Sequence, residues 1–131
     1  MSLTDEERVA IVKYRIEKAF VALEDVNQMT LLGRWSAAAN RMYYAVYYAA
    51  TALLINNGHI TRTHSGMITQ INIHFVLPGI LTKADGRLIN KIFDLRQEAD
   101  YDDFIDADEN DIKEYFPQVK ALIEKIVLLI K

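Results

Sequence analysis

The sequence predicts an all-α fold, an antiparallel up-and-down bundle of four to five helices, in a single domain over residues 1–131. Apolar residues recur at three- and four-residue intervals along most of the chain, which is the period of an amphipathic helix. Capping and stop residues flank these segments. The chain has no internal repeat and no linker long enough to divide it, so packing its helices into one antiparallel bundle is the natural solution.

Each expected helix has its own boundary signal. Thr4 and Glu7 have the spacing of a capping box at the first start. Asn57-Gly58 closes the second helix as a left-handed cap. Pro117 falls inside the last periodic segment and should kink that helix or shift its start, because proline lacks a backbone donor. The expected helices cover approximately residues 4–27, 31–56, 63–77 (capped by Thr63 or Ser65 and ending before Pro78), 83–99 and 108–130 (capped by Asp108).

Composition excludes several classes of protein. The chain has no cysteine, so it has no disulfide framework, thiolate metal site or cysteine nucleophile. No run of about 18 apolar residues is present, so we expect no membrane span. The acidic start of the chain does not resemble a signal peptide. We therefore expect a soluble, cytoplasmic protein, and no motif calls for a cofactor.

The charge is distributed unevenly. Residues 1–97 hold 11 Lys/Arg and 8 Asp/Glu, whereas residues 98–131 hold 4 and 10. No acidic residue lies between Asp25 and Asp85, a stretch that contains three arginines, one lysine and all three histidines. Such a stretch suits an anionic ligand such as a nucleotide or RNA phosphate. A buried central hairpin with few charges would explain it equally well.

The second helix is rich in tyrosine. Arg41, Tyr44 and Tyr48 share one helical face, while Tyr43 and Tyr47 form a second stacked pair. Tyrosine rings pack well in helix cores and interfaces, yet their hydroxyl groups need partners. This face is therefore either part of the core or an interface, or a polar-aromatic surface around Arg41 that contacts a ligand or a second subunit.

The histidines do not predict a metal site. No two of His59, His64 and His74 have the i, i+3 or i, i+4 spacing of helical zinc ligands. His64 follows Thr63 at a predicted helix start, where its ring and the free amides could contact an anion. A histidine that is simply hydrogen-bonded near a cap is at least as good an explanation.

Nine of the 17 residues from Glu98 to Glu114 are acidic. Read from Asp106, this segment lacks the glycine and glutamate of a calcium-binding loop, so we expect a solvated loop and helix start that repels nucleic acid. Just before it, Arg96 and Asp100 are four residues apart at a helix end and should form an ion pair.

A series of short motifs spans about residues 34 to 104. They are Ala39-Asn40-Arg41-Met42-Tyr43-Tyr44-Ala45, then Ala52-Leu53-Leu54 with Gly58, Thr63-His64-Ser65-Gly66, His74-Phe75-Val76, and Leu95-Arg96-Gln97-Glu98-Ala99-Asp100-Tyr101. In this order and spacing they resemble the HEPN family, specifically its small stand-alone bacterial and archaeal branch.

The resemblance implies a helical bundle that usually forms a homodimer. Many members of the family are metal-independent ribonucleases, often toxins paired with a small nucleotidyltransferase-type antitoxin, and others are nucleotide-binding or scaffold domains. In the nucleases an arginine and a histidine, four to six residues apart, meet their counterparts from the second subunit in one cleft. Histidine transfers a proton near neutral pH, and arginine neutralises the phosphate.

This sequence departs from that pattern. Tyr101 stands five residues after Arg96, and no arginine is followed by a histidine at the required distance. Because an unperturbed tyrosine has a pKa of about 10, it is a poor base at pH 7.

Three functions remain open. The first is a HEPN-type module that binds nucleotide, RNA or a partner protein without efficient cleavage. The second is a metal-independent ribonuclease in which His64 or Tyr101 replaces the histidine. The third is a purely structural dimer, with the tyrosine helix as its interface. The candidate residues are Arg96 and Tyr101 for catalysis and Arg41, Tyr44, His64 and Asp100 for ligand binding.

Overall fold

The computed structural model describes residues 3–101 and 106–130, apart from the side chain of Tyr101. The described residues form five α-helices and one short π-helix and contain no strand. Their bounds are α1 Asp5–Leu31, α2 Trp35–Asn56, α3 His64–Ile71, the π-helix η1 Asn72–Val76, α4 Lys83–Tyr101 and α5 Glu109–Leu129.

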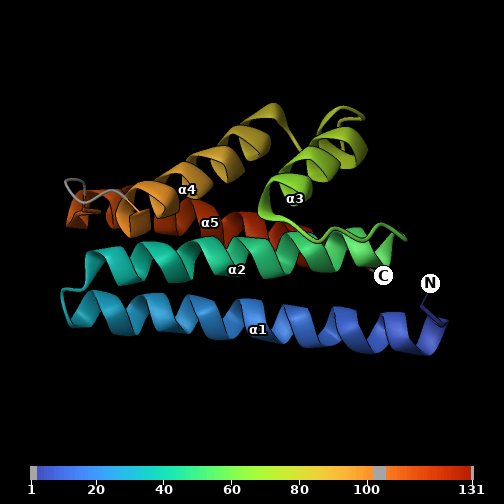
Figure 1. Ribbon diagram of the computed structural model, residues 1–131, viewed down its shortest axis with the longest axis horizontal. Helices are drawn as coiled ribbons and strands as arrows, with labels where there is room; N and C mark the ends of the chain where they lie inside the picture. Colours follow the sequence, from blue (N-terminus) through green and yellow to red (C-terminus); the bar gives the residue numbers. More distant parts are fainter. Residues whose placement is uncertain (1–2, 102–105, 131) are drawn as a thin grey trace.

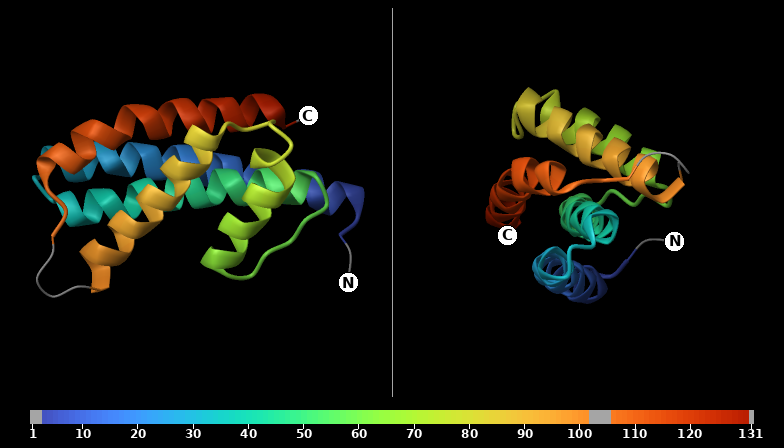
Figure 2. Two further views of the ribbon diagram at one scale, coloured as in Figure 1. Left: turned by 90° about the horizontal axis from the view of Figure 1, so that it is seen from above. Right: turned by 90° about the vertical axis from the view of Figure 1, so that its left-hand side faces the viewer.

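The four long helices alternate in direction along the chain (Figure 1). Helix α2 is central, because it packs against α1, α3, α4 and α5. The short helix α3 and helix α4 cross α2 obliquely on the side opposite α1 (Figure 2). The predicted all-α, up-and-down bundle is therefore confirmed, with α3 and η1 inserted between its second and third long helices.

Side-chain caps fix where α1, α3 and α5 begin. At α1 the Glu7 amide donates to Thr4 Oγ1 at 3.1 Å, and the Thr4 amide donates to Glu7 Oε1 at 2.9 Å. Asp108 forms the same reciprocal pair with Asp111 at α5. Of the two residues considered for the third helix, Thr63 is the cap. Each pair satisfies backbone donors that the first turn leaves without a partner.

Three predicted helix boundaries were wrong. Helix α1 continues to Leu31, and α2 begins only at Trp35 rather than near residue 31. Gly33 makes the turn between them with φ of 69°, a conformation that glycine adopts without the steric cost of a Cβ atom. Helix α4 also runs two residues beyond its predicted end, so Asp100 is helical. Half of the predicted acidic loop, residues 102–105 of 100–107, lies outside the described residues.

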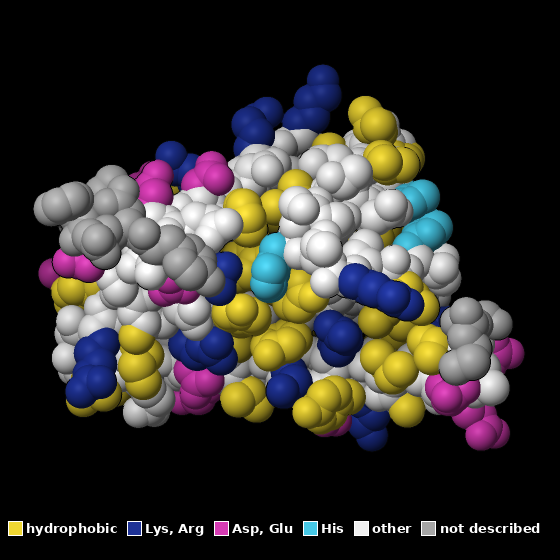
Figure 3. Space-filling model, in the orientation of Figure 1, with side chains coloured by type: hydrophobic (Ala, Val, Ile, Leu, Met, Phe, Trp, Pro, Cys, Tyr) yellow, Lys and Arg dark blue, Asp and Glu magenta, His cyan; other side chains and the backbone are white. Residues whose placement is uncertain are grey.

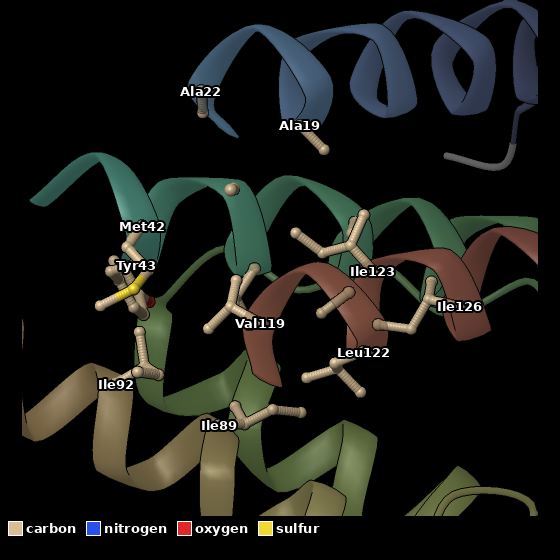
Figure 4. Close-up of a cluster of buried hydrophobic side chains, with 14 of the residues drawn as sticks. Ala19, Ala22, Met42, Tyr43, Ile89, Ile92, Val119, Leu122, Ile123 and Ile126 are labelled. Carbon is tan, nitrogen blue, oxygen red and sulfur yellow. The ribbon is translucent and has the colours of Figure 1, made fainter. Parts of the chain in front are cut away.

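The core lies between α2, α4 and α5, with alanines of α1 closing its far side (Figure 4). Ala19 and Ala22 are buried where α1 packs on α2, and their small side chains allow the two helices to approach closely. Helix α5 contributes Val119, Leu122, Ile123 and Ile126. Pro117 lies inside α5, which continues on both sides of it. No helix in the described part of the chain combines the length and the apolar character that crossing a membrane would need.

We expect Ile123→Ala to lower the free energy of unfolding by about 2–5 kcal/mol, because it removes a fully buried side chain and leaves a cavity. Urea unfolding followed by circular dichroism would measure the change. Val21→Ala is the control, since Val21 is 61% exposed and its truncation should change stability by less than about 0.5 kcal/mol. Equal effects of the two substitutions would contradict the assigned core.

Candidate functional site

Four tyrosines of α2 meet α3 and α4 in one polar-aromatic cluster. We call this the tyrosine cluster: Tyr43, Tyr44, Tyr47 and Tyr48. Successive ring centroids lie between 5.4 and 6.1 Å apart, within the range of edge-to-face and tilted aromatic pairs. Figure 3 shows a histidine near the middle of one face, next to side chains of the hydrophobic class, in which tyrosine is included, and several Lys/Arg side chains.

Tyr43 anchors the cluster to the core. Its side chain is fully buried, and its ring packs edge-on against Phe93 of α4 at 5.6 Å. Its hydroxyl oxygen lies 2.7 Å from Nδ1 of His64. This hydrogen bond satisfies a buried polar group and fixes the orientation of the imidazole ring. Burial raises the pKa of Tyr43, so its hydroxyl stays neutral.

His64 is held by the start of α3. It is the first residue of that helix, which Thr63 caps by accepting from the Gly66 amide at 2.9 Å. Glycine favours this cap, because a Cβ atom on residue 66 would lie 2.7 Å from Thr63 Oγ1 and would displace the capping hydroxyl. The half-buried imidazole lies 4.7 Å from the Tyr47 ring and 5.9 Å from the Tyr44 ring, measured between centroids.

Arg96 enters the cluster from α4 and is only 8% exposed. Its Nε lies 2.9 Å from a carboxylate oxygen of Asp100, so the predicted ion pair is confirmed. Its guanidinium carbon lies 5.6 and 5.4 Å from the ring centroids of Tyr43 and Tyr44. Its Nη2 also donates to the Tyr44 hydroxyl at 3.4 Å. Ion pairing and ring contacts together compensate for removing this charge from water.

Arg41 joins the same network through Asn40. Its Nε and Nη2 donate to Asn40 Oδ1 at 3.1 and 2.9 Å. The Asn40 amide nitrogen then donates to Asp100 at 2.9 Å. Asn40 thus bridges the two arginines, using both its acceptor and its donor. From the sequence we assigned no role to Asn40. The feature that could have pointed to it is a polar residue that follows three alanines and precedes Arg41.

The pKa of His64 is lowered, first by burial and second by the positive charge of Arg96. Its imidazole is therefore neutral at pH 7 and can accept a proton or a hydrogen bond. The Arg41 guanidinium lies 5.0 Å from the Tyr44 ring, so two arginines and the imidazole all lie close to Tyr44. Positive charge, a titratable base and aromatic surface are thus concentrated around one tyrosine.

Five of the six residues singled out from the sequence converge here. The structure brings together Arg41, Tyr44, His64, Arg96 and Asp100. Tyr101 ends α4, one residue after Asp100, but its side chain lies outside the described residues. Within residues 3–101 and 106–130, no three His, Asp or Glu side chains are grouped as metal ligands would be.

The other two histidines lie elsewhere. His59 and His74 stack on each other with ring centroids 3.7 Å apart and an interplanar angle of 11°. His74 Nε2 lies 2.8 Å from Gln70 Oε1. Burial, followed by the neighbouring His74, lowers the pKa of His59. This pair joins the loop after α2 to η1 and takes no part in the tyrosine cluster.

The family model of the HEPN domain matches residues 12–129. The chain belongs to the HEPN family. That match covers α1 from residue 12 onward and the other four α-helices in full, including the segments that carry the tyrosine cluster and Arg96.

Relatives of this HEPN protein come from bacteria and archaea. A "UPF0332 protein" of Thermotoga maritima is 30% identical over 125 residues, covering 95% of each chain. A protein of Methanocaldococcus jannaschii named "Putative toxin" is 38% identical over 64 residues, about half of each chain. A second protein of that organism with the same designation is 31% identical over 87 residues, 66% of this chain and 59% of its own.

Arg96→Gln should raise the pKa of His64 toward its ordinary value near 6.5, because the substitution removes a positive charge that disfavours protonation. NMR titration of the imidazole protons would measure it, with His64→Gln to assign the signal. Lys91→Gln removes an exposed charge from the same helix and serves as the control. An unchanged or lower pKa for His64 in Arg96→Gln would show that the two groups are not electrostatically coupled.

Proposed function

We propose that this HEPN protein is a toxin-type module that binds the phosphate of RNA or a nucleotide at the tyrosine cluster, without efficient cleavage. One observation carries the proposal. The guanidinium groups of Arg41 and Arg96 both lie against the Tyr44 ring, at 5.0 and 5.4 Å, and His64 lies 5.9 Å from the same ring. Cations beside an aromatic face suit a ligand that combines phosphate with a base.

Arg41 is the group best placed to meet the phosphate. It is half-buried, and Asn40 holds two of its nitrogens, so little side-chain entropy is lost when a ligand binds. No acidic residue lies between Asp25 and Asp85, so α2 and α3 add no negative charge of their own to this surface. His64 becomes an additional cation when the pH falls below its lowered pKa.

Arg96 is better suited to holding this site in place than to stabilising the transition state of a phosphate reaction. It is buried and paired with Asp100, which offsets much of its charge. The residue five positions further on is Tyr101, a weak base at neutral pH. Both features favour binding over efficient cleavage.

The biological setting that we propose is a toxin–antitoxin-type system. The support is the family and the relatives named "Putative toxin". By the same resemblance, a homodimer and a small nucleotidyltransferase-type protein are the expected partners. We also expect the protein to act in the cytoplasm, where RNA substrates are present.

Arg41→Ala should weaken RNA binding at least severalfold and reduce the slope of log affinity against log salt by about one, because one phosphate contact is lost. Fluorescence anisotropy with labelled single-stranded RNA at several salt concentrations would measure both. Arg87→Ala removes an exposed arginine of α4 and should have no such effect. If the two variants bound RNA alike, this site would be ruled out.

Cleavage of RNA without a metal is the second candidate. It is favoured because His64 and Arg96 lie against the same Tyr44 ring, which brings an arginine and a histidine together in space although they are 32 residues apart in the sequence. A neutral His64 would accept the proton of a ribose 2′-hydroxyl as that oxygen attacks the adjacent phosphate. The P–O5′ bond then breaks, which leaves a 2′,3′-cyclic phosphate, and the departing 5′-oxygen takes a proton from water or from the imidazolium. The arginines would neutralise the developing charge.

This candidate predicts that the purified protein cuts single-stranded RNA in the presence of a metal chelator. His64→Ala should then reduce the cleavage rate by at least a hundredfold, in the range usual for a general base, while His74→Ala leaves it unchanged. Lack of cleavage across RNAs of varied sequence would exclude the ribonuclease and leave the binding proposal intact.

A further inference from the structure

We propose that Tyr14 and Lys18 of α1, together with Tyr48 of α2, form a second subsite that holds a further nucleotide of a single-stranded RNA bound at the tyrosine cluster. The inference rests on the proposed function and extends it. It makes α1 part of the binding surface, although none of the motifs that resemble the family lies in that helix.

A continuous row of rings connects the two subsites. It starts at His64, whose ring centroid is 4.7 Å from that of Tyr47. Tyr48 follows at 6.0 Å from both Tyr47 and Tyr44. The Lys18 ammonium then lies 5.3 Å from the centroid of Tyr48. Because each step is a direct contact, a bound strand can pass from α3 to α1 without leaving an aromatic or basic surface.

Tyr14 ends the row on α1. The Lys18 ammonium lies 5.3 Å from its ring as well, so Lys18 stands between two tyrosines. Tyr14 is 57% exposed, which leaves ring surface available to a base. A large exposed aromatic ring next to a fixed cation is the arrangement that binds successive bases and phosphates of single strands.

The charges beside this subsite are available to a ligand. Arg15 Nη1 donates to Thr51 Oγ1 at 3.0 Å, which holds its guanidinium at the seam between α1 and α2. Within residues 3–101 and 106–130, no carboxylate lies within ion-pair distance of Lys18 or Arg15. Figure 3 shows Lys/Arg side chains interspersed with hydrophobic ones below the central histidine, on the α1 side of this face. A phosphate would therefore meet cations that are oriented but not neutralised.

The row of rings should also distinguish single-stranded RNA from an RNA duplex. Stacking on tyrosine needs unpaired bases with accessible faces, which a duplex does not offer. The surface should therefore bind single-stranded RNA in preference to a duplex of the same length. It should also bind an oligonucleotide more tightly than a mononucleotide, because only the oligonucleotide reaches α1.

The test compares two probes, uridine monophosphate and a non-cleavable 2′-O-methyl oligouridylate decamer. The double variant Tyr14→Ala/Lys18→Gln should weaken binding of the decamer about fivefold or more and leave binding of the mononucleotide within about twofold. Lys13→Gln/Phe20→Ala is the matched control, since it removes one lysine and one exposed aromatic residue from other faces of α1. Unfolding midpoints should confirm that both variants fold.

Each outcome decides between the two proposals. If the wild type binds both probes but the double variant binds the decamer normally, the α1 subsite is wrong and the proposed function stands. If the variant loses both probes equally while remaining folded, the α1 residues belong to the first site, and a separate subsite is overturned. If the wild type binds neither probe, the proposed function fails, and the inference fails with it.

Discussion

The burial of the Arg96 charge is the constraint on which the site depends. The charge of an arginine that is only 8% exposed must be compensated by the groups around it. Asp100 supplies the carboxylate, and Tyr43 and Tyr44 supply ring faces. Removing one partner of a buried pair typically costs about 3–5 kcal/mol, and the 24% exposure of the Asp100 side chain reduces that cost here. The packing of α4 on α2 therefore determines the electrostatics of the surface above it.

Two sets of contacts lead outward from this charge. One passes through the ion pair with Asp100 and then through Asn40 to Arg41, and it fixes a second guanidinium at the surface. The other passes through the Tyr43 ring, whose hydroxyl holds the imidazole of His64. Structural and binding roles are thus distributed over different residues. Arg96 and Tyr43 stabilise the arrangement from inside, whereas Arg41, Tyr44 and His64 present it to a ligand.

The sequence predicted the helices well, because periodicity and capping are local. The capping box at Thr4 and the Thr63 and Asp108 caps needed no tertiary information. The sharing of one face by Arg41, Tyr44 and Tyr48 likewise follows from helical spacing. The break between the first two helices was predicted too early in the chain, because nothing in the residues before Gly33 marks where α1 ends.

The assembly of the site could not be predicted from local patterns. His64 meets Tyr43 only because the loop after α2 turns α3 back across that helix, and Asn40 meets Asp100 across 60 residues of sequence. Contacts of this kind depend on how the bundle packs, which no short motif encodes. The row of rings that reaches Lys18 also depends on how the bundle packs, because it forms only when α1 and α2 lie side by side.

Chemical-shift mapping tests the central claim most directly. A non-cleavable single-stranded RNA would be titrated into isotopically labelled protein, and the side-chain signals of arginine, tyrosine and histidine would be followed. Our account predicts that Arg41, Tyr44 and His64 shift together with a common dissociation constant that weakens with salt. Shifts confined to other faces of the bundle, or none at saturating RNA, would contradict it.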